Sequence, residues 1–419
     1  MKIHFVGNLG VSMRALAALA AARGHTVTGS DRASGGHDGD NVVGCDLIVY
    51  TNAVPQDNEE LVMARALGIP TVERATYLGE LSKTYGSVIA VAGCHGKSTT
   101  TAMLGAAFSD RNPTVHVGVD GGSRVGSQRY FITEACEYKE SFLQLKPDVG
   151  IVLNVQYDHP DYYRDDAQLI GAYKKFCARC KAVLVNGDDP LCEGLKGDAI
   201  TFGLSETCKY RATNIRAENG CYGFDYYGSR RAKITLSVAG RHNVYNALAT
   251  LAAADMCGVG IAESARGLSG FYGIPRRFER KGIAFGKTVL TDYAHHPTEI
   301  EATIATAREM FPSVAVVFQP HTYSRTESLM DGFVGALAKA DTVVLAPIFS
   351  AREKPNGLSS HTLCRKLLEK TERAYCFDTF VEIVEYCKKI DTKALIFMGA
   401  GDIDKAAELF INSDEYNIY

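Results

Sequence analysis

Short apolar segments of strand length alternate with longer amphipathic segments along the whole chain. Runs such as VIAVAG, residues 88–93, and GIVLNV, residues 150–155, are apolar without alternation. Continuous apolar runs are typical of parallel strands that are covered on both faces. We therefore predict strands at IHFVG, LIVYT, VIAVAG, YFITEA, GIVLNV and AVLVNG in the first half, and at TVLTDY, VAVVF, TVVLAPI and ALIFMG near the C-terminus.

Helical periodicity appears between these strands, for example in SMRALAALAAARG and PTEIEATIATAREMF. Strands that alternate with helices predict an α/β fold. The pattern changes between about residues 200 and 240, where CKYRATNIRAENGCYGFDYYG and RRAKITLSV predict antiparallel strands with a turn at Asn219-Gly220. We expect this part to form a small antiparallel sheet.

The length of 419 residues favours two to four domains. SKTYGS, residues 82–87, separates the first α/β group from the next strand, and the basic segment IPRRFERKGIAFGK, residues 274–287, precedes the last group. We predict three domains, at 1–84, 85–282 and 283–419.

Composition and charge exclude several classes of protein. With 46% hydrophobic and 22% charged residues and a net charge of −3, the chain is neither disordered nor a dedicated nucleic-acid binder. It contains no apolar run near the ~20 residues of a membrane span, and its start, MKIHFVGNLG, does not resemble a secretion signal. We expect a cytoplasmic protein. The only CxxC, Cys177 and Cys180, falls in a predicted helix, so we expect ordinary thiols rather than zinc ligands.

A phosphate-binding loop is predicted at GCHGKST, residues 93–99, between a strand and a helix. There, backbone amides and the positive end of the helix point at an anion. Gly93 and Gly96 allow close approach, Lys97 neutralises phosphate charge, and Ser98 or Thr99 offers a hydroxyl to Mg²⁺. The loop is shorter than the common GxxxxGK[ST] pattern, and the alternative is a simple helix-capping turn.

Two further strands end in acidic or imidazole groups. Glu134 ends YFITE, with Glu137 three residues later, and a carboxylate beside a phosphate-binding loop can hold Mg²⁺. NVQYDHPDYY then places Asp158, His159 and Asp161 within four residues at the next strand end. Ligands of α/β sheets bind at this edge. Solvated acids and a structural histidine are the alternatives.

Polar clusters also occur near the end of the central domain and in the third domain. Asn243 and Asn246 share one face of a helix and could bind an adenine edge, although helix caps have the same pattern. TDYAHHPTE and QPHTYSRTES follow two adjacent strands, and Arg325 in the second suits a carboxylate or phosphate. At the N-terminus, GNLGVSM followed by Asp31 resembles a dinucleotide-binding turn, for which NAD is a competing ligand.

Taken together, these segments resemble the Mur ligase family. The resemblance rests on HFVGNLGVSM, GSD, TNAVP, GCHGKSTTT, EACEYKESFL, NVQYDHPDYY, GRHNVYNA, PRRF, DYAHHPTE, QPHTYSRT and MGAGD, in this order over nearly the whole chain. The two motifs DYAHHPTE and QPHTYSRT resemble those of the branch of this family that acts on UDP-N-acetylmuramate.

The resemblance implies a shortened Rossmann-like N-terminal domain for the UDP-sugar, a central P-loop ATPase-type α/β domain for ATP, and a Rossmann-like C-terminal domain for the amino acid. It implies an ATP-dependent ligase that joins L-alanine to the lactyl carboxylate of UDP-N-acetylmuramate through an acyl phosphate, in peptidoglycan precursor synthesis. The implied cofactors are ATP and Mg²⁺. The implied partners are small molecules only, for a monomer or homodimer without nucleic acid or membrane partners.

Carried over by motif, the resemblance implies roles for individual residues. It implies catalysis by Lys97, Glu134, His159, His295 and Arg325, and Mg²⁺ ligation by Ser98, Glu134 and His159. The implied ATP site comprises Gly93, Cys94, His95, Gly96, Lys97, Ser98, Thr99, His242, Asn243, Asn246, Arg277 and Asp292. The implied UDP-sugar contacts are Gly7, Asn8, Gly10, Met13, Asp31, His37 and Thr51, and the amino-acid contacts are Tyr293, His295 and Arg325.

Two alternatives stay open: a murein-peptide ligase, which attaches a recycled peptide instead of alanine, and a non-catalytic UDP-sugar or nucleotide sensor. The sequence also departs from the family pattern in its first domain. After Asp31, RASGGHDGDNVVGCDLIVYT lacks about one βα unit, and Gly-Asn-Leu-Gly replaces Gly-x-Gly-Gly. Because Leu9 carries a Cβ, the turn is expected to allow the pyrophosphate less room.

Overall fold

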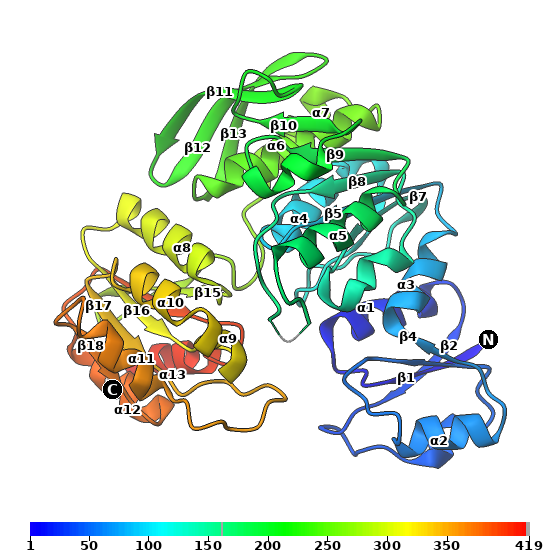
Figure 1. Cartoon of the computed structure of the whole chain (residues 1–419), viewed down its shortest axis with the longest axis horizontal. Helices are drawn as coiled ribbons and strands as arrows, with labels where there is room; N and C mark the ends of the chain where they lie inside the picture. The colour runs from blue at the N-terminus through cyan, green and yellow to red at the C-terminus, as the bar shows by residue number, and fades with distance from the viewer. Residues whose placement is uncertain (161, 416–419) are drawn as a thin grey trace.

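The computed structural model describes residues 1–160 and 162–415, which form three lobes in chain order. Figure 1 shows the N-terminal lobe in blue, the central lobe in cyan and green, and the C-terminal lobe in yellow to red. Each lobe is built on its own sheet, of four, nine and six strands respectively. Within the described residues, no helix has the length and apolar character that a membrane crossing requires.

The N-terminal sheet is parallel, with strand order β2-β1-β3-β4. Its strands are β1 Lys2–Val6, β2 Thr26–Ser30, β3 Leu47–Tyr50 and β4 Thr71–Glu73, and its helices are α1 Val11–Ala22, α2 Glu59–Ala66 and α3 Arg74–Ser82. Between β2 and β3 the chain forms a single 3₁₀ turn, Gly39–Val42, instead of a further helix and strand. The first domain thus lacks one βα unit, as the sequence predicts; β2 is an edge strand, and its residues Thr28 and Gly29 are exposed.

A buried polar cluster surrounds Glu60 on α2. The Glu60 carboxylate is fully buried, and it accepts hydrogen bonds from Ser30 Oγ at 2.6 Å and Asn41 Nδ2 at 2.7 Å. The imidazoles of His37 and His4 lie 2.9 and 3.4 Å from its oxygens. Burial raises the pKa of Glu60, but these four partners outweigh burial and lower it to about 2. The cluster fixes the segment that replaces the missing unit.

We expect Glu60→Gln to lower the free energy of unfolding by about 2–3 kcal/mol at neutral pH, because the buried network loses its charged acceptor. The pKa of Glu60 is lowered from 4.5 to about 2, so its contribution is complete above about pH 4.5 and is lost as the pH falls through about 2. The stability difference from the wild type, measured by chemical denaturation, should therefore shrink on acidification. Glu59→Gln, on the exposed face of the same helix, is the matched control. An equal effect of both variants would contradict this expectation.

The central domain is a nine-stranded sheet with order β13-β12-β11-β10-β9-β8-β5-β7-β6. Its strands are β5 Ser87–Ala92, β6 Pro113–His116, β7 Ser127–Glu134, β8 Val149–Val152, β9 Ala182–Asn186, β10 Ile200–Gly203, β11 Tyr210–Glu218, β12 Cys221–Tyr227 and β13 Arg231–Ala239. Its helices are α4 Lys97–Ala107, α5 Asp166–Cys177, α6 His242–Met256 and α7 Ile261–Ser269, with 3₁₀ turns Ser109–Arg111, Tyr138–Gln144 and Pro190–Leu195.

The predicted antiparallel strands are present as β11, β12 and β13. They do not form a separate sheet, because β11 pairs in parallel with β10 and so extends the central sheet. Asn219 and Gly220 both have positive φ, 50° and 74°, which suits the tight turn predicted between β11 and β12. Both cysteines of the CxxC, Cys177 and Cys180, are half-buried and form no disulfide.

The C-terminal sheet has the order β14-β15-β19-β16-β17-β18, with only β14 antiparallel. Its strands are β14 Glu279–Ala284, β15 Lys287–Asp292, β16 Val314–Phe318, β17 Thr342–Leu345, β18 Ala374–Cys376 and β19 Ala394–Met398. Its helices are α8 Pro297–Met310, α9 Tyr323–Ser328, α10 Met330–Leu337, α11 Ser360–Leu367, α12 Phe380–Lys389 and α13 Asp404–Glu415. The predicted division after residue 282 falls within β14, so this sheet begins at Glu279; the domain limits otherwise stay a prediction.

The three lobes are joined in different ways. Phe5 and Leu16 of the N-terminal domain belong to the same apolar cluster as Phe131 and Tyr173 of the central domain. The apolar clusters within the C-terminal domain are separate from it in the described residues. The C-terminal domain instead meets the central domain through polar contacts, such as the 2.6 Å hydrogen bond from Tyr222 Oη to Glu309. Polar contacts are less costly to break and remake, so the C-terminal domain is the lobe suited to move.

Candidate active site

The predicted phosphate-binding loop connects β5 to α4. Gly93 and Gly96 have φ values of 144° and 83°, which side chains other than glycine rarely adopt. A Cβ on Gly96 would lie 2.6 Å from Asn246 Oδ1 on α6. The glycines therefore allow the loop to bring its amides and the N-terminus of α4 to the carboxyl edge of the sheet.

Lys97 lies across this loop in an ion pair with Glu137. Its Nζ donates to the two Glu137 carboxylate oxygens at 2.9 and 3.0 Å and to the Gly93 carbonyl at 2.5 Å. Burial opposes both charges, but each partner favours the charged form of the other, so the pKa of Lys97 is raised and that of Glu137 is lowered. Lys97 is thus a charged donor held inside the loop.

Glu137 is the carboxylate that pairs with Lys97, whereas Glu134, the predicted Mg²⁺ ligand, has other contacts. Glu134 lies opposite Val91 at the carboxyl end of β7, and its Oε1 accepts a hydrogen bond from the amide of Gly118 at 2.8 Å. Both carboxylates therefore lie on the same edge of the sheet, at different distances from the loop. The sequence contained the signal for Glu137, which follows Glu134 by three residues.

His159 lies beside the Lys97–Glu137 pair. Its Nε2 is 3.7 Å from Glu137 Oε1 and 3.8 Å from Asp158 Oδ2, and its ring packs on Tyr138. A φ of 58° at His159 turns the chain sharply after β8, so Asp158 and His159 face different neighbours. Asp161, the third member of the predicted cluster, lies outside the described residues.

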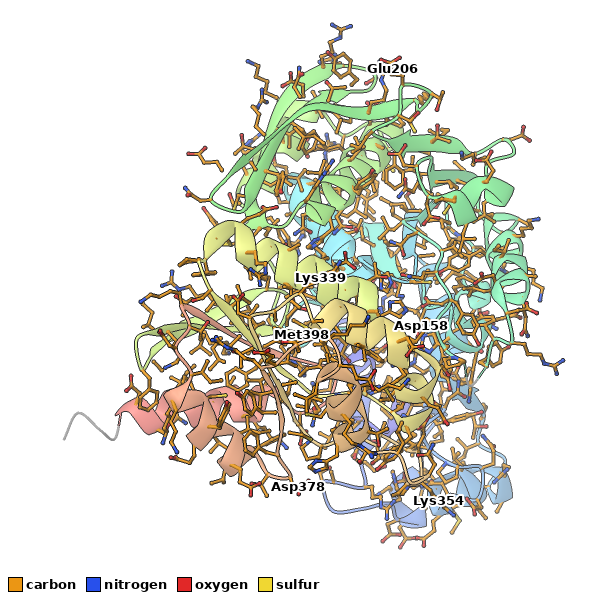
Figure 2. All side chains as sticks on the ribbon, turned by 60° about the vertical axis from the view of Figure 1, so that its left-hand side comes forward. Asp158, Glu206, Lys339, Lys354, Asp378 and Met398 are labelled. Carbon is orange, nitrogen blue, oxygen red and sulfur yellow. The ribbon has the colours of Figure 1, made fainter. Side chains whose placement is uncertain are left out.

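Arg325 of α9 reaches this region from the C-terminal domain. Its Nε and Nη2 donate to Asp158 Oδ1 at 3.0 and 2.8 Å, and both side chains are about 7% exposed. Figure 2 shows Asp158 where the C-terminal lobe lies against the central domain. The predicted amino-acid residues Tyr293 and His295 are in ring contact with each other, and His295 faces His321, whose Nδ1 is 3.2 Å from Arg325 Nη1. The structure therefore brings these predicted residues together.

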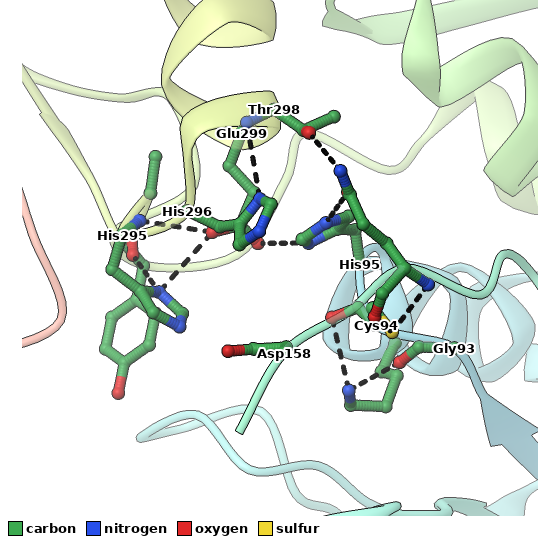
Figure 3. A network of polar contacts seen from close by, with 12 residues as sticks. Gly93, Cys94, His95, Asp158, His295, His296, Thr298 and Glu299 are labelled. Carbon is green, nitrogen blue, oxygen red and sulfur yellow. Dashed lines mark hydrogen bonds and ion pairs between the residues drawn. The ribbon is translucent and has the colours of Figure 1, made fainter. Parts of the chain in front are cut away.

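A second polar link joins the loop to helix α8 (Figure 3). His95 Nδ1 lies 3.1 Å from Glu299, and His95 Nε2 lies 2.7 Å from the side chain of Gln156, which in turn donates to Thr298 Oγ1 at 2.8 Å. Burial disfavours charge on both groups, but the pair overcomes this, so the pKa of His95 is raised and that of Glu299 is lowered. The sequence motifs contained Gln156 and Glu299 but gave no sign of this interdomain contact.

A cavity of about 1040 Å³ lies between the central and C-terminal domains on the α6 side of the loop. Its lining includes the predicted ATP residues His95, Gly96, Thr99, His242, Asn243, Asn246, Arg277 and Asp292. Other lining residues that the sequence did not single out are Asn186, Asp188, Tyr245 and Thr303. The volume and the adjoining phosphate loop suit a nucleotide.

Several predicted ATP residues support this cavity rather than face it freely. Asn246 Nδ2 donates to Asn243 Oδ1 at 2.9 Å, and both side chains are buried. Cys94 is also buried, with its Sγ 2.7 Å from the Gln156 carbonyl. Asp292 accepts the amides of Phe278 and Ala294, and burial raises its pKa to about 6. These residues fix the walls of the cavity.

The described residues contain no group of three His, Cys, Asp or Glu side chains arranged to hold a metal. Mg²⁺ does not need such a group, because it retains waters and takes one or two protein oxygens together with substrate phosphates. The Glu134 carboxylate, half-buried with one amide partner, fits that requirement, and Ser98, the second residue of α4, carries a hydroxyl oxygen. The nitrogen of His159 fits it less well.

The N-terminal turn, 7–13, lies at the carboxyl edge of its own sheet. The amides of Gly7 and Asn8 donate to the Ser30 carbonyl, and that of Leu9 to Asp31. Asp31 and Thr51 therefore lie beside the turn, as predicted, with the Thr51 methyl against Gly7.

The structure shows the exposure or the contacts of three further residues in this turn and its surroundings. Met13 is buried in the core, so its side chain is not available to a ligand. His37 points to Glu60 and Ser30 and is 18% exposed. Leu9 is 41% exposed, and the expected effect of its Cβ on the room for a pyrophosphate stays a prediction.

Comparisons with known proteins agree with this architecture. Three family models match successive parts of the chain: the Mur ligase family catalytic domain at residues 2–85, the Mur ligase middle domain at 91–254 and the Mur ligase glutamate ligase domain at 276–401. UDP-N-acetylmuramate–L-alanine ligase of Acetivibrio thermocellus is 41% identical over 455 positions, covering 99% of this chain and 96% of that protein. The same enzyme of Clostridium novyi is 40% identical, covering 98% and 97%.

The first alignment spans 455 positions and this chain has 419 residues, so at least 36 positions have no residue here, in line with a shortened chain. Among solved structures, UDP-N-acetylmuramate-alanine ligase MurC of Thermotoga maritima matches with a TM-score of 0.85 and 29% identity over 100% of both chains. A murein peptide ligase of Psychrobacter arcticus shares the fold, with a TM-score of 0.71 and 22% identity over 99% and 98%. With these matches along its full length, the chain belongs to the Mur ligase family.

Proposed function

We propose that this protein is an ATP-dependent ligase that joins L-alanine to the lactyl carboxylate of UDP-N-acetylmuramate. One observation carries the proposal: the adjacent residues Asp158 and His159 contact the groups that we assign to the two chemical steps. His159 lies beside the Lys97–Glu137 pair of the phosphate loop, and Asp158 binds Arg325 of the C-terminal domain. Activation and amide formation can therefore take place in one cleft. The relatives with 40–41% identity carry this activity in their names.

The first step is activation of a poor electrophile. A lactyl carboxylate oxygen attacks the γ-phosphorus of ATP, the bond to the bridging oxygen breaks, and ADP leaves. Lys97 gives up its contact with Glu137 and donates instead to an oxygen of the transferred phosphoryl group. The loop amides bind the neighbouring phosphate oxygens. Mg²⁺, held by the oxygens of Ser98 and Glu134, would neutralise further phosphate charge.

The second step forms the amide. The uncharged amine of alanine attacks the acyl carbon, the carbon–oxygen bond of the acyl phosphate breaks, and inorganic phosphate leaves with the electron pair and takes up the proton that the amine nitrogen loses. Tyr293, His295 and the Nη1 of Arg325 form the surface on which the amino acid is held. Acyl phosphates hydrolyse readily, so the polar contacts of the C-terminal domain also serve to close the cleft against water.

The sequence left open a recycled peptide as the acceptor and a non-catalytic sensor. The comparisons favour alanine, because the protein named as an alanine ligase is the better structural match, 0.85 against 0.71 in TM-score. The charged Lys97–Glu137 pair and the adjacent His159 argue for retained chemistry over a sensor. We place the enzyme in the cytoplasm.

The test is alanine-dependent phosphate release by the purified protein with ATP, Mg²⁺ and UDP-N-acetylmuramate, with mass spectrometry of the product. We expect release with L-alanine and a product heavier by one alanyl group. A tripeptide that begins with L-alanine serves as the competitor, and preferential use of it would assign the peptide-ligase activity instead. Nucleotide binding without any release would favour the sensor.

A further inference from the structure

An arginine outside the predicted site lies at the boundary between the N-terminal turn and the phosphate loop. Arg74 is the first residue of α3, and its Nη1 donates to Ser12 Oγ, in the first turn of α1, at 3.2 Å. The same hydroxyl lies 3.0 Å from Nε2 of His116, the last residue of β6 in the central domain. Arg74 is half-buried at this contact between two domains.

The charge of Arg74 has no carboxylate partner. Among the residues that the structure describes, no acidic oxygen lies within ion-pair distance of it, whereas Arg277 and Arg325 of the active site pair with Glu299 and Asp158. A guanidinium has five N–H donors, and within the described residues Arg74 gives only one of them to the protein, to a neutral hydroxyl. A half-buried and unpaired guanidinium suits an anionic ligand, above all a carboxylate that it can bind through two parallel hydrogen bonds.

Arg74 also lies toward the transfer site. Cys136 immediately precedes Glu137, the partner of Lys97; burial raises the pKa of its thiol to about 11, and the charges of Lys97 and Arg74 both oppose this rise. Burial, assisted by Arg74, lowers the pKa of His116 to about 4, so His116 is neutral at pH 7 and adds no competing charge. In geometry, Arg74 shares the Ser12 hydroxyl of the N-terminal domain with His116 of the central domain, so it lies where these two domains meet.

We propose that Arg74 binds the lactyl carboxylate of the sugar nucleotide and presents it to the phosphoryl group held by Lys97. This inference rests on the proposed function, since it needs a substrate anchored on the N-terminal domain whose carboxylate reaches the loop of the central domain. The pyrophosphate of the same substrate is the other possible anion. The carboxylate is favoured because Arg74 lies on the side of Ser12 that faces the central domain. Of the whole substrate, only the reacting end, which bears the carboxylate, must reach this side.

The test compares two sugar nucleotides that differ only in the lactyl ether: UDP-N-acetylmuramate, which carries the carboxylate, and UDP-N-acetylglucosamine, which does not. Binding of each to the full-length protein is measured by calorimetry without ATP or alanine. We expect Arg74→Ala to weaken binding of UDP-N-acetylmuramate by ~10- to 100-fold. Binding of UDP-N-acetylglucosamine should stay within about twofold of the wild type. Arg74→Lys, which keeps the charge, should recover part of the loss.

Arg23 provides a matched control. It lies at the far end of α1, its guanidinium packs 4.6 Å from the ring centre of Tyr85, and it also lacks a carboxylate partner in the described residues. Eleven residues of helix separate it from Ser12, which corresponds to roughly 17 Å. Arg23→Ala should leave both affinities unchanged, so a loss shared with Arg74→Ala would indicate a general effect on domain packing.

Three results would overturn the proposal. Equal weakening of both nucleotides would assign Arg74 to the pyrophosphate or to domain packing, and unchanged binding of UDP-N-acetylmuramate would remove Arg74 from the site. A selective loss in Arg74→Ala that Arg74→Lys does not reduce at all would contradict a charge-based contact. Failure of the wild type to bind UDP-N-acetylmuramate is a separate outcome, which would reject the proposed function itself.

Discussion

Replacement of Lys97 by alanine should reduce kcat by about 10³-fold or more while ATP still binds in the cavity. The ammonium lies in the loop with its charge maintained by Glu137, so it is placed to meet the negative charge of the phosphoryl group during transfer. Removal of one such pre-placed donor typically costs about 10²–10³ in rate, and more where it carries a full charge. Alanine-dependent phosphate release under saturating substrates measures the effect. Activity within about tenfold of the wild type would show that the loop has another role.

A variant without Lys97 also leaves Glu137 buried and without its main partner, which could destabilise the loop by itself. Lys97→Met combined with Glu137→Gln removes both charges and avoids this cost. This double variant should fold like the wild type in calorimetry and remain as inactive as Lys97→Ala. Lys175→Ala, which breaks the exposed pair with Glu140, is the control and should retain activity. Recovery of turnover in the double variant would mean that Lys97 acts only by neutralising Glu137.

The sequence was sufficient for features that depend on neighbouring residues. VIAVAG followed by GCHGKST predicted a strand, a turn and a helix. The apolar run, the glycines and the helix-forming residues each favour their own local structure. The turn at Asn219-Gly220 was predictable for the same reason. The short edge strand β2, TVTGS, was expected only from its place before Asp31 and not from its pattern, because three of its five positions are polar and one is glycine, so its pairing depends on β1.

Residues whose role depends on distant contacts were harder to predict. The sequence assigned Glu134 to Mg²⁺ because it ends the strand, but it gave no partner for Lys97, and the irregular turn after β7 directs Glu137 to it. Within that turn Lys139 and Glu140 have positive φ, which no periodic pattern encodes. The same limit applies to Glu299, whose partner His95 lies in the central domain. The motif DYAHHPTE placed Glu299 near the start of a helix, while the contact between two lobes selected its neighbour. No motif singled out Arg74.

Replacement of Arg325 by alanine should lower kcat/KM for L-alanine by about 10²–10³-fold. Arg325 is the main group that keeps the pKa of the buried Asp158 below its ordinary value, against the opposing effect of burial. Removal of one partner from a buried pair costs about 3–5 kcal/mol, because the other charge is left without compensation. The pKa of Asp158 should then rise. When the domains close, Asp158 should therefore take up a proton at a higher pH than in the wild type. Arg308→Ala, which breaks an exposed pair with Asp341 in the same domain, is the matched control.

A double variant separates the two roles that Arg325 can have. If Arg325 only fastens the domains, Arg325→Leu with Asp158→Asn removes the uncompensated charge and should restore both closure, seen by small-angle X-ray scattering with nucleotide bound, and turnover. If Arg325 also holds the amino acid through its third nitrogen, closure should return while kcat/KM for alanine stays low. We expect the second result, because two of the three nitrogens are on Asp158 and Nη1 faces His321 and the cleft. Full recovery of both measurements would limit Arg325 to a fastening role and would leave the alanine carboxylate without its proposed partner.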